Sequence, residues 1–357
     1  MKKPGMLLAA CTTLFCFLCC ALQAQTEIFY VWPDSLPGEQ DTTKTGCVRP
    51  SIEAYIPQAD IATGAAFLIC PGGAYYMIWG DETDPPAQYL QNRGIAAFVL
   101  NYRHKDCKHP MPMWDAERAM RLIRSKAADY GIDPDRIGIM GFSAGGHLAS
   151  TIGTHYDTGT PSSPDPIERY SSKPTAMVLG YPCITMNDPH AHGTTRQYLL
   201  GGNTSQDALD YLSNEKHVDA NTPPTFITYT DSDKIVDAMN SVIFYDSLQK
   251  YGVESKMVIE PGKDHGYNIE GTWMDSCLLW LEQIGFLSSS SSKAINSRRG
   301  LLLAPDIQRK SIATHSALVQ QLHLPWGQKI LVPSNPALKT APSGFVIFDC
   351  KGRVLAP

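Results

Sequence analysis

The pentapeptide Gly141-Phe142-Ser143-Ala144-Gly145 has the composition of a turn built around a serine nucleophile. It follows an expected strand at 136–140 and precedes an expected helix from His147 onward. Glycines on both flanks permit a tight turn that lifts the Ser143 hydroxyl above the edge of a sheet. The helix N-terminus offers the N–H of Ala144 and a positive dipole to a developing oxyanion. We therefore predict Ser143 as a nucleophile; a glycine-rich turn with an incidental serine is the alternative.

A serine hydroxyl is a weak nucleophile and needs a base that is oriented by a carboxylate. Asp233 follows an expected strand at 225–229, and His265 follows an expected strand at 254–260. Both loops would lie at the carboxyl edge of the sheet, beside Ser143, in the chain order serine, acid, histidine. We predict His265 as the base and Asp233 as the acid. Two neighbouring carboxylates remain rivals for the acid: Asp231 and Asp264.

An oxyanion hole needs a second N–H donor. The segment Cys70–Tyr75 ends an early apolar run and stands where the donating loop is expected, with Gly73 or Ala74 as the donor. A plain turn at the end of a strand is the alternative. Four aromatic residues could line a pocket for a sugar or an aromatic acyl group, or belong equally to the core: Tyr75, Tyr76, Trp79 and Trp114.

The elements that must position these residues alternate from Ser51 to Leu287. Near-continuous apolar strands that alternate with helices are typical of an α/β fold, in which helices cover both faces of a mostly parallel sheet. The expected strands are 65–70, 94–102, 136–140, 175–180, 225–229 and 254–260, and the expected helices are 86–93, 115–130, 236–251 and 271–285.

Residues 1–24 have the organisation of a secretory signal, with Lys2 and Lys3, an apolar run at 6–22 and the small residue Ala24. The apolar run is at the short edge for a membrane anchor. Lipoprotein processing at Cys11 is the other alternative. We expect a secreted or periplasmic protein without stable membrane insertion after cleavage, and attachment to the cell surface stays open.

The net charge of −5 over 357 residues hides two segments. Residues 25–292 carry a charge of −14, whereas residues 293–357 contain nine basic and two acidic residues. The acidic balance gives no reason to expect a nucleic-acid partner. We expect a catalytic domain at 25–287, a serine-rich linker at 288–300, and a basic extension with short β segments at 301–357.

Cysteines and histidines offer further chemistry. Six of ten cysteines lie beyond the signal, and we expect at most one or two disulfides, because an exported chain can form them but a core of this size does not need them. We expect His147 to be a packed helix residue. Two loop clusters could be metal ligands but lack the paired spacing of a zinc site: His104, Cys107 and His109, and Asp188, His190 and His192. We predict no metal.

Five stretches together resemble the α/β-hydrolase superfamily, and more narrowly the bacterial exported esterases of the acetyl xylan esterase and feruloyl esterase type. They are CPGGAYY, GIAAFVLNYR, DAERAMRLIRSKAADYGIDPDRIGIMGFSAGGHLAS, TPPTFITYTDSDKIVD and GKDHGY. The resemblance implies Ser143 as nucleophile, Asp233 as acid and His265 as base. Ala74 departs from the usual third glycine of the first motif, and the proline usual after the acid is absent.

The resemblance implies an exported serine carboxylesterase that needs no cofactor and acts on acylated plant polysaccharide, acetyl xylan first, or on a small ester. A feruloyl esterase, an exopeptidase on the same fold, and a binding protein with an idle hydrolase domain are the alternatives. The motif GFVIFDCKGRVL faintly resembles the end of β-sandwich sorting modules, of which the extension would be a truncated form. A basic tail that holds the chain near an acidic surface is the alternative.

Overall fold

The computed structural model describes residues 26–33, 36–38, 47, 49–287, 319–323, 329–333, 347–348 and 354–356. The chain divides into two compact units, 1–302 and 303–357. The expected signal and linker lie outside the described residues, as does most of the expected extension, so the predicted domain boundaries stay predictions. No helix in the described part of the chain is long and apolar enough to cross a membrane.

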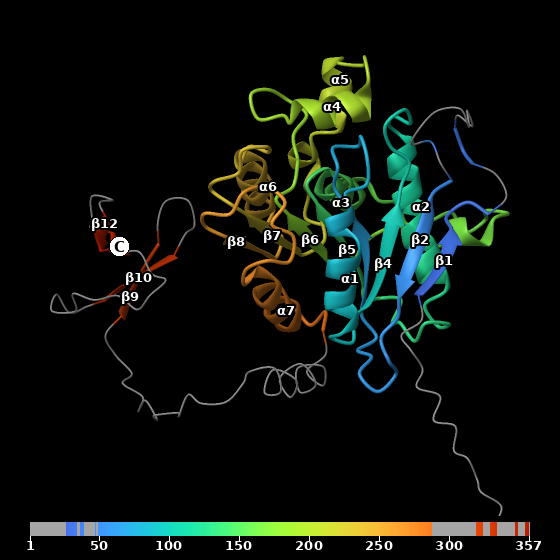
Figure 1. Ribbon diagram of the computed structural model, residues 1–357, viewed down its shortest axis with the longest axis horizontal. Helices are drawn as coiled ribbons and strands as arrows, with labels where there is room; N and C mark the ends of the chain where they lie inside the picture. Colours follow the sequence, from blue (N-terminus) through green and yellow to red (C-terminus); the bar gives the residue numbers. More distant parts are fainter. Residues whose placement is uncertain are drawn as a thin grey trace, which may run out of the picture. The chain divides into compact units, whose positions relative to one another are not determined.

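One eight-stranded sheet organises the first unit, in the order β1-β2-β4-β3-β5-β6-β7-β8 (Figure 1). β1 pairs antiparallel with β2, and β2 pairs antiparallel with β4. The six strands from β4 to β8 in this order run parallel to one another. The bounds are β1 Thr26–Tyr30, β2 Ser51–Tyr55, β3 Ala66–Cys70, β4 Ala96–Asn101, β5 Ile137–Phe142, β6 Met177–Gly180, β7 Thr225–Tyr229 and β8 Ser255–Ile259.

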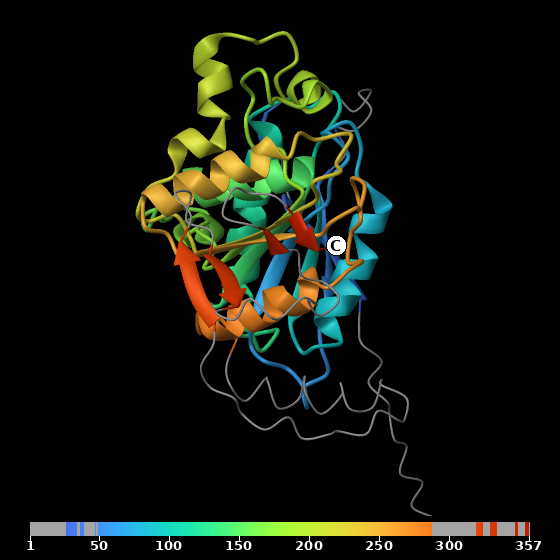
Figure 2. The ribbon, with the colours of Figure 1, turned by 90° about the vertical axis from the view of Figure 1, so that its left-hand side faces the viewer.

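Two apolar cores lie on opposite faces of this sheet, because successive side chains of a strand point to opposite faces. In β3, Leu68 and Cys70 belong to one core, and Phe67 and Ile69 belong to the other. The first core is covered by α2 Met111–Ser125, α3 Ala144–His155 and α6 Met239–Lys250, and the second by α1 Asp84–Gln91 and α7 Trp273–Gln283 (Figure 2). The predicted α/β fold, with helices on both faces of a mostly parallel sheet, is confirmed.

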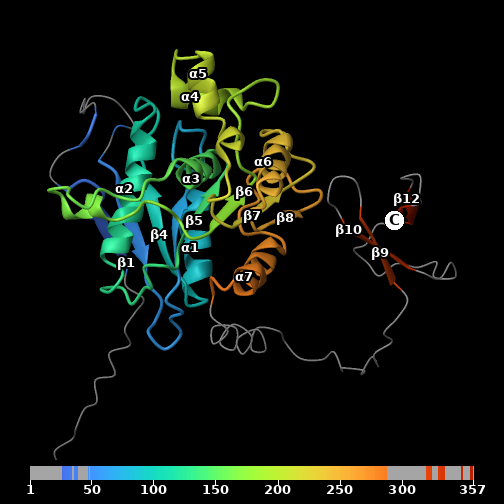
Figure 3. The ribbon, with the colours of Figure 1, turned by 180° about the vertical axis from the view of Figure 1, so that it is seen from behind.

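Helices α4 (Gly193–Leu200) and α5 (Gln206–Tyr211) lie beyond the carboxyl ends of the central strands, as Figures 1 and 3 both show. They belong to the long connection between β6 and β7, together with the short 3₁₀ helix Asn214–His217. The connection also packs against the core, since Leu199 and Leu200 of α4 are buried in it. This connection covers the sheet edge at which the predicted catalytic loops end.

Several element boundaries differ from the expected ones. α7 is shorter than the expected helix because Gly271 and Gly285 have φ of +98° and +79°, outside the helical region. α2 begins four residues before the expected start, with Pro112 in its first turn, where proline is tolerated. Four elements are not among the expected ones: β1, β2, α4 and α5.

A buried ion pair and a disulfide hold the segment between β4 and α2. The guanidinium of Arg103 lies 2.7 Å from Asp115 on α2, and both side chains are fully buried. Cys107 forms a disulfide with Cys47, which fits the expectation of at most one or two bridges. The other described cysteines, Cys70, Cys183 and Cys277, are buried free thiols.

The second unit contains two antiparallel strand pairs. β9 (Val319–His323) pairs with β10 (Lys329–Pro333), and β11 (Ile347–Phe348) pairs with β12 (Val354–Ala356). The sequence predicts short β segments in this part of the chain, and its expected role as a basic extension stays a prediction.

Candidate active site

Ser143 stands at a strained turn between β5 and α3, with φ +52° and ψ −120°. The two flanking glycines make this turn possible. A Cβ atom on Gly145 would lie 2.0 Å from the carbonyl oxygen of Cys70, and one on Gly141 would lie 2.1 Å from that of Gly145. A non-glycine residue with positive φ costs about 1–3 kcal/mol and persists only where its surroundings hold it. The packing around the turn therefore holds Ser143 in this conformation and fixes the direction of its side chain.

His265 lies between Ser143 and Asp233 and is hydrogen-bonded to both. Its Nε2 is 2.9 Å from the Oγ of Ser143, and its Nδ1 is 2.7 Å from the Oδ2 of Asp233. The side chains of His265 and Asp233 are 14% and 3% exposed. The three residues follow β5, β7 and β8, so the parallel sheet brings them to one edge. Chemically, Nε2 can accept the serine proton while the carboxylate orients and stabilises the imidazolium.

The carboxylate of Asp233 is fixed by its own loop. Its Oδ1 accepts the N–H groups of Ile235 and Val236, both at 2.9 Å. An aspartate that binds backbone donors two and three residues ahead closes a tight turn by itself. This turn keeps Oδ2 free for His265, and it forms without the proline that similar sequences carry here.

The two rival aspartates contact other groups. Oδ1 of Asp231 accepts the N–H of Gly262 at 3.3 Å. Oδ2 of Asp264 pairs with the ammonium group of Lys234 at 2.8 Å, which holds the pKa of that carboxyl below its usual range. Among the described residues, neither aspartate forms a hydrogen bond with the ring of His265.

Two residues that no sequence motif indicates lie beside the serine, directly after β6. The ring of Tyr181 packs edge-on against that of His265, with 4.9 Å between centroids. The N–H of Cys183 donates to the carbonyl oxygen of Ser143 at 3.0 Å. Burial raises the pKa of the Cys183 thiol to about 12, so it stays neutral. Both residues follow β6, whose carboxyl end lies beside that of β5. This position after a parallel strand is the sequence feature from which they could have been predicted.

The loop after β3 reaches the serine through Gly72. A Cβ atom on Gly72 would lie 2.9 Å from the Cβ of Ser143. The N–H of Gly72 donates to the Oε2 of Glu82 at 2.6 Å and is therefore occupied. In the described residues, no hydrogen bond occupies the N–H of Gly73 or Ala74, whose φ values are +111° and +56°. Both N–H groups lie on the loop that approaches Ser143 through Gly72.

The opposite donor predicted for the oxyanion is the N–H of Ala144. Ala144 is the first residue of α3 and directly follows Ser143. The first N–H groups of a helix have no acceptor within it, and the helix dipole makes this end positive. The N–H of Ala144 thus lies at the positive end of α3, and its role toward an oxyanion stays a prediction.

Tyr75 belongs to the core, so we no longer treat it as a substrate-binding residue. It is 1% exposed, and its hydroxyl lies 3.0 Å from Nδ1 of His147. The Nε2 of His147 contacts the carbonyl oxygen of Leu212 at 2.8 Å. Burial lowers the pKa of His147 to about 4, so it is neutral in a packed environment, as the sequence predicts.

Other predicted aromatic residues lie at the surface. Tyr76 and Trp79 are 42% and 44% exposed, on the same loop as Gly73. The ring of Tyr76 lies 4.8 Å from that of Tyr198 on α4. Trp114 lies on α2 and is partly buried. Tyr76 and Trp79 can therefore meet a bound molecule, which Tyr75 cannot.

The two histidine clusters have other partners. Cys107 is consumed by its disulfide, and the ring of His104 contacts the carbonyl oxygen of Tyr76 at 3.1 Å. His190 is hydrogen-bonded to Asp237 at 2.6 Å. Across the residues that the structure describes, no group of three or more suitable side chains could hold a metal ion.

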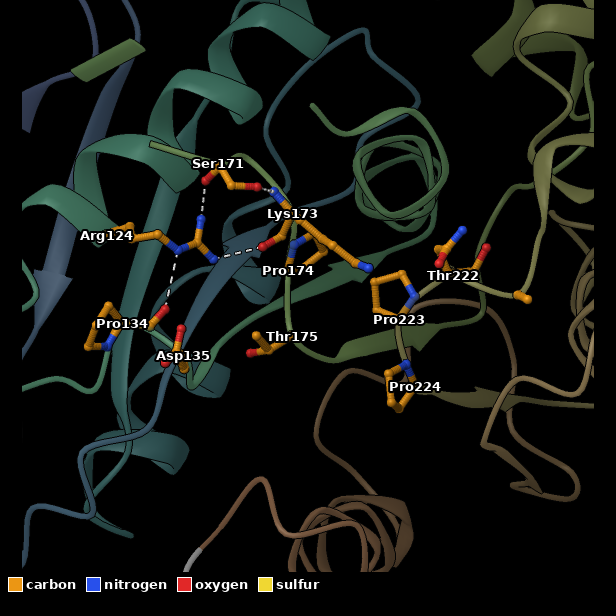
Figure 4. Close-up of a pocket in the computed structure, with 12 residues that line it drawn as sticks. Arg124, Pro134, Asp135, Ser171, Lys173, Pro174, Thr175, Thr222, Pro223 and Pro224 are labelled. Carbon is orange, nitrogen blue, oxygen red and sulfur yellow. Dashed lines mark hydrogen bonds between the residues drawn. The ribbon is translucent and has the colours of Figure 1, made fainter. Parts of the chain in front are cut away.

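A pocket of about 620 Å³ lies at the opposite edge of the sheet, where β6 and β7 begin (Figure 4). Arg124 donates there to the carbonyl oxygens of Lys173 at 2.7 Å, Pro134 at 3.2 Å and Ser171. These carbonyl contacts engage all three of its guanidinium nitrogens. The pocket is therefore separate from the site around Ser143.

Two bacterial proteins are similar to this chain over about three fifths of its length. Endo-1,4-beta-xylanase B of Butyrivibrio fibrisolvens is 34% identical over 62% of this chain and 35% of its own length. Acetylxylan esterase of Xylanibacter ruminicola is 33% identical over 59% of this chain and 42% of its own length. The chain thus spans well under half the length of these two relatives.

A solved structure is also similar to this chain in sequence and in fold. The acetyl ester-xyloside bifunctional hydrolase from Caldicellulosiruptor lactoaceticus is 36% identical, with a TM-score of 0.71, over 75% of this chain and all of the other. The family description BD-FAE matches residues 52–248, which include Ser143 and Asp233. The predicted resemblance is confirmed: the chain belongs to the BD-FAE family and has the α/β-hydrolase fold.

Proposed function

We propose that this protein is a serine carboxylesterase that removes acetyl groups from xylan. The hydrogen-bond chain from Ser143 through His265 to Asp233 carries the proposal. The Oγ of Ser143 attacks the ester carbonyl while Nε2 of His265 takes its proton, and Asp233 stabilises the resulting imidazolium. His265 then returns the proton to the leaving sugar oxygen as its bond to the acyl carbon breaks, which frees the sugar hydroxyl. Water, activated by His265 in turn, attacks the acyl-enzyme, releases acetate and regenerates Ser143.

The negative charge of both tetrahedral intermediates needs donors that are already in place. We assign this role to the N–H of Ala144 and to that of Gly73 or Ala74. The unoccupied N–H groups of the loop after β3 support this assignment, and so does the close approach of Gly72 to Ser143. Oriented donors in a site largely closed to water stabilise an oxyanion without reorganising.

Acetyl as the acyl group is supported by the closed surroundings of the nucleophile. Ser143 is 7% exposed, and the buried residues Tyr181 and Cys183 lie beside it. Xylan as the substrate is supported by the named relatives, two of which act on xylan and one on acetyl ester and xyloside. The exposed rings of Tyr76 and Trp79 lie on the loop that carries the oxyanion donor, where a sugar ring could stack.

Export is part of the proposal. The sequence of residues 1–24 supports it. The Cys47–Cys107 disulfide also supports it, because disulfides form and persist outside the reducing cytosol. We place the mature enzyme in the periplasm or outside the cell.

The test compares the purified chain with its Ser143→Ala variant on an aryl acetate, on acetylated xylan, on a feruloyl ester and on an aminoacyl anilide. We expect release of acetate from the first two by the unaltered chain only. Equal ester turnover in both proteins would rule out Ser143 as nucleophile. Cleavage of the anilide alone would favour the exopeptidase, and a preference for ferulate over acetate would favour a feruloyl esterase.

A further inference from the structure

Glu82 is a buried carboxylate that the proposed mechanism does not use. It ends the short 3₁₀ helix Gly80–Glu82 and is 2% exposed. In the described residues, no lysine or arginine pairs with it. Each of its oxygens has one donor: Oε2 accepts the N–H of Gly72 at 2.6 Å, and Oε1 accepts the hydroxyl of Tyr181 at 2.9 Å. Burying a carboxylate without a cationic partner costs free energy. A functional role for Glu82 would explain why a carboxylate occupies this position.

The first contact fixes the oxyanion loop, by which we mean residues 71–79. A Cβ atom on Gly72 would lie 2.6 Å from Oε2 of Glu82 and 2.9 Å from the Cβ of Ser143. Gly72 is therefore held between the carboxylate and the nucleophile. The peptide group that follows carries the N–H of Gly73, so its placement depends on how Glu82 holds Gly72.

The second contact leads to the histidine loop, by which we mean residues 260–272. The hydroxyl of Tyr181 donates to Glu82 and accepts the N–H of Asn268 at 3.1 Å. Asn268 lies three residues after His265, and its side-chain amide donates to the carbonyl oxygen of Asp81. The ring of Tyr181 also packs against the ring of His265. Tyr181 thus contacts both Glu82 and the ring of His265, the proposed base.

We propose that Glu82 is a positioning residue that couples the oxyanion loop to the histidine loop through Tyr181. It sets the oxyanion donor and the imidazole at a fixed distance from the Oγ of Ser143. Its catalytic consequence rests on the proposed function, whereas its structural consequence does not. The expected effect is on transition-state stabilisation, because the oxyanion forms only after attack.

The test uses the full chain with Glu82→Ala, Glu82→Gln and Tyr181→Phe. The control is Glu117→Gln, which alters a buried glutamate on α2, a helix that carries neither a member of the Ser143–His265–Asp233 chain nor any part of the oxyanion loop. For Glu82→Ala we expect kcat on an aryl acetate to fall about 10–100-fold, below the loss seen when an oxyanion donor is removed outright, with KM within about threefold. Glu82→Gln keeps an acceptor for Gly72 and should recover part of kcat. Glu117→Gln should keep kcat within about twofold.

A double variant separates coupling from general damage. If Glu82 and Tyr181 act as one unit, Glu82→Ala combined with Tyr181→Phe should lose little more kcat than Glu82→Ala alone. Three results would overturn the proposal. They are a double variant whose loss of kcat is the product of the two single losses, a change in KM without a change in kcat, and a loss of kcat for Glu82→Ala no larger than that for Glu117→Gln.

Hydrogen exchange tests the coupling without any substrate. Glu82→Ala should speed backbone exchange in both the oxyanion loop and the histidine loop, and Glu117→Gln in neither. If the unaltered chain hydrolyses no ester, the proposed function fails, but this exchange result still decides the role of Glu82. Faster exchange confined to the oxyanion loop would refute the coupling.

Discussion

The Nδ1 of His265 lies 2.7 Å from Oδ2 of Asp233, 32 residues earlier in the chain. The aspartate next to His265, Asp264, does not contact the ring and instead accepts the backbone N–H of His265 at 2.9 Å. Neighbouring side chains of a loop diverge, whereas loops from adjacent parallel strands converge at one sheet edge. The order of strands in the sheet therefore determines which aspartate reaches the ring of His265.

Asp233→Asn should lower kcat/KM on an aryl acetate by about 10³–10⁴-fold, because the amide disfavours the required tautomer and no longer stabilises the imidazolium. Asp231→Asn and Asp264→Asn are the matched controls and should stay within about threefold. Steady-state kinetics on the three purified variants provide the measurement. A loss for Asp264→Asn as large as that for Asp233→Asn would contradict the assignment of the acid.

Gly73→Ala should lower kcat at least about tenfold. The φ of Gly73 is +111°, and a Cβ atom there would lie 2.2 Å from the carbonyl oxygen of Met77, so the loop must shift and its N–H with it. Ala74→Gly should keep kcat within about threefold, since the N–H remains and φ of +56° suits glycine. Kinetics and thermal unfolding of both variants check this; an active Gly73→Ala enzyme would place the donor elsewhere.

Stability should decline between about pH 6.5 and pH 4. Burial lowers the pKa of His155 to about 4, and His147 contributes in the same way. Burial lowers the folded pKa of His147 to about 4 from an ordinary 6.5, so over this range the unfolded chain binds a proton that the folded chain does not. The free energy of unfolding lost through His147 is about 3 kcal/mol at the acid end. Urea unfolding at pH 7.5 and 4.5 measures it. His147→Gln should reduce the difference by about 2 kcal/mol; an unchanged difference would show that other groups cause the decline.

Asp115→Asn should destabilise the chain by about 3–5 kcal/mol, because it leaves the guanidinium of Arg103 buried without its counter-charge. Glu270→Gln removes a surface pair between Lys263, which is 36% exposed, and Glu270, which is 70% exposed, and should cost at most about 1 kcal/mol. Urea unfolding at neutral pH compares the two. Equal losses would mean that burial of the Arg103–Asp115 pair has no energetic weight.

Much of the fold could be predicted from the sequence because its parallel strands are short apolar runs flanked by turn residues. The expected strand 225–229 coincides with β7, and the expected strand 65–70 differs from β3 by one residue. Strand β1 at the edge of the sheet and its neighbour β2 were not predicted, because outer strands of a sheet need no continuous apolar run. In β2 the buried and partly exposed side chains alternate over most of the strand.

Ser143 could be predicted because the conformation of its turn is local: Gly141 and Gly145 are required by atoms within a few residues or in the neighbouring strand. The chain order alone also indicated loops that would carry an acid and a base. Tertiary structure decided among Asp231, Asp233 and Asp264, since that choice depends on how two loops meet. It also shows that Tyr75 lies in the core and that Glu82 is hydrogen-bonded to Gly72 and Tyr181. These contacts arise from packing between segments up to 99 residues apart, which no local pattern encodes.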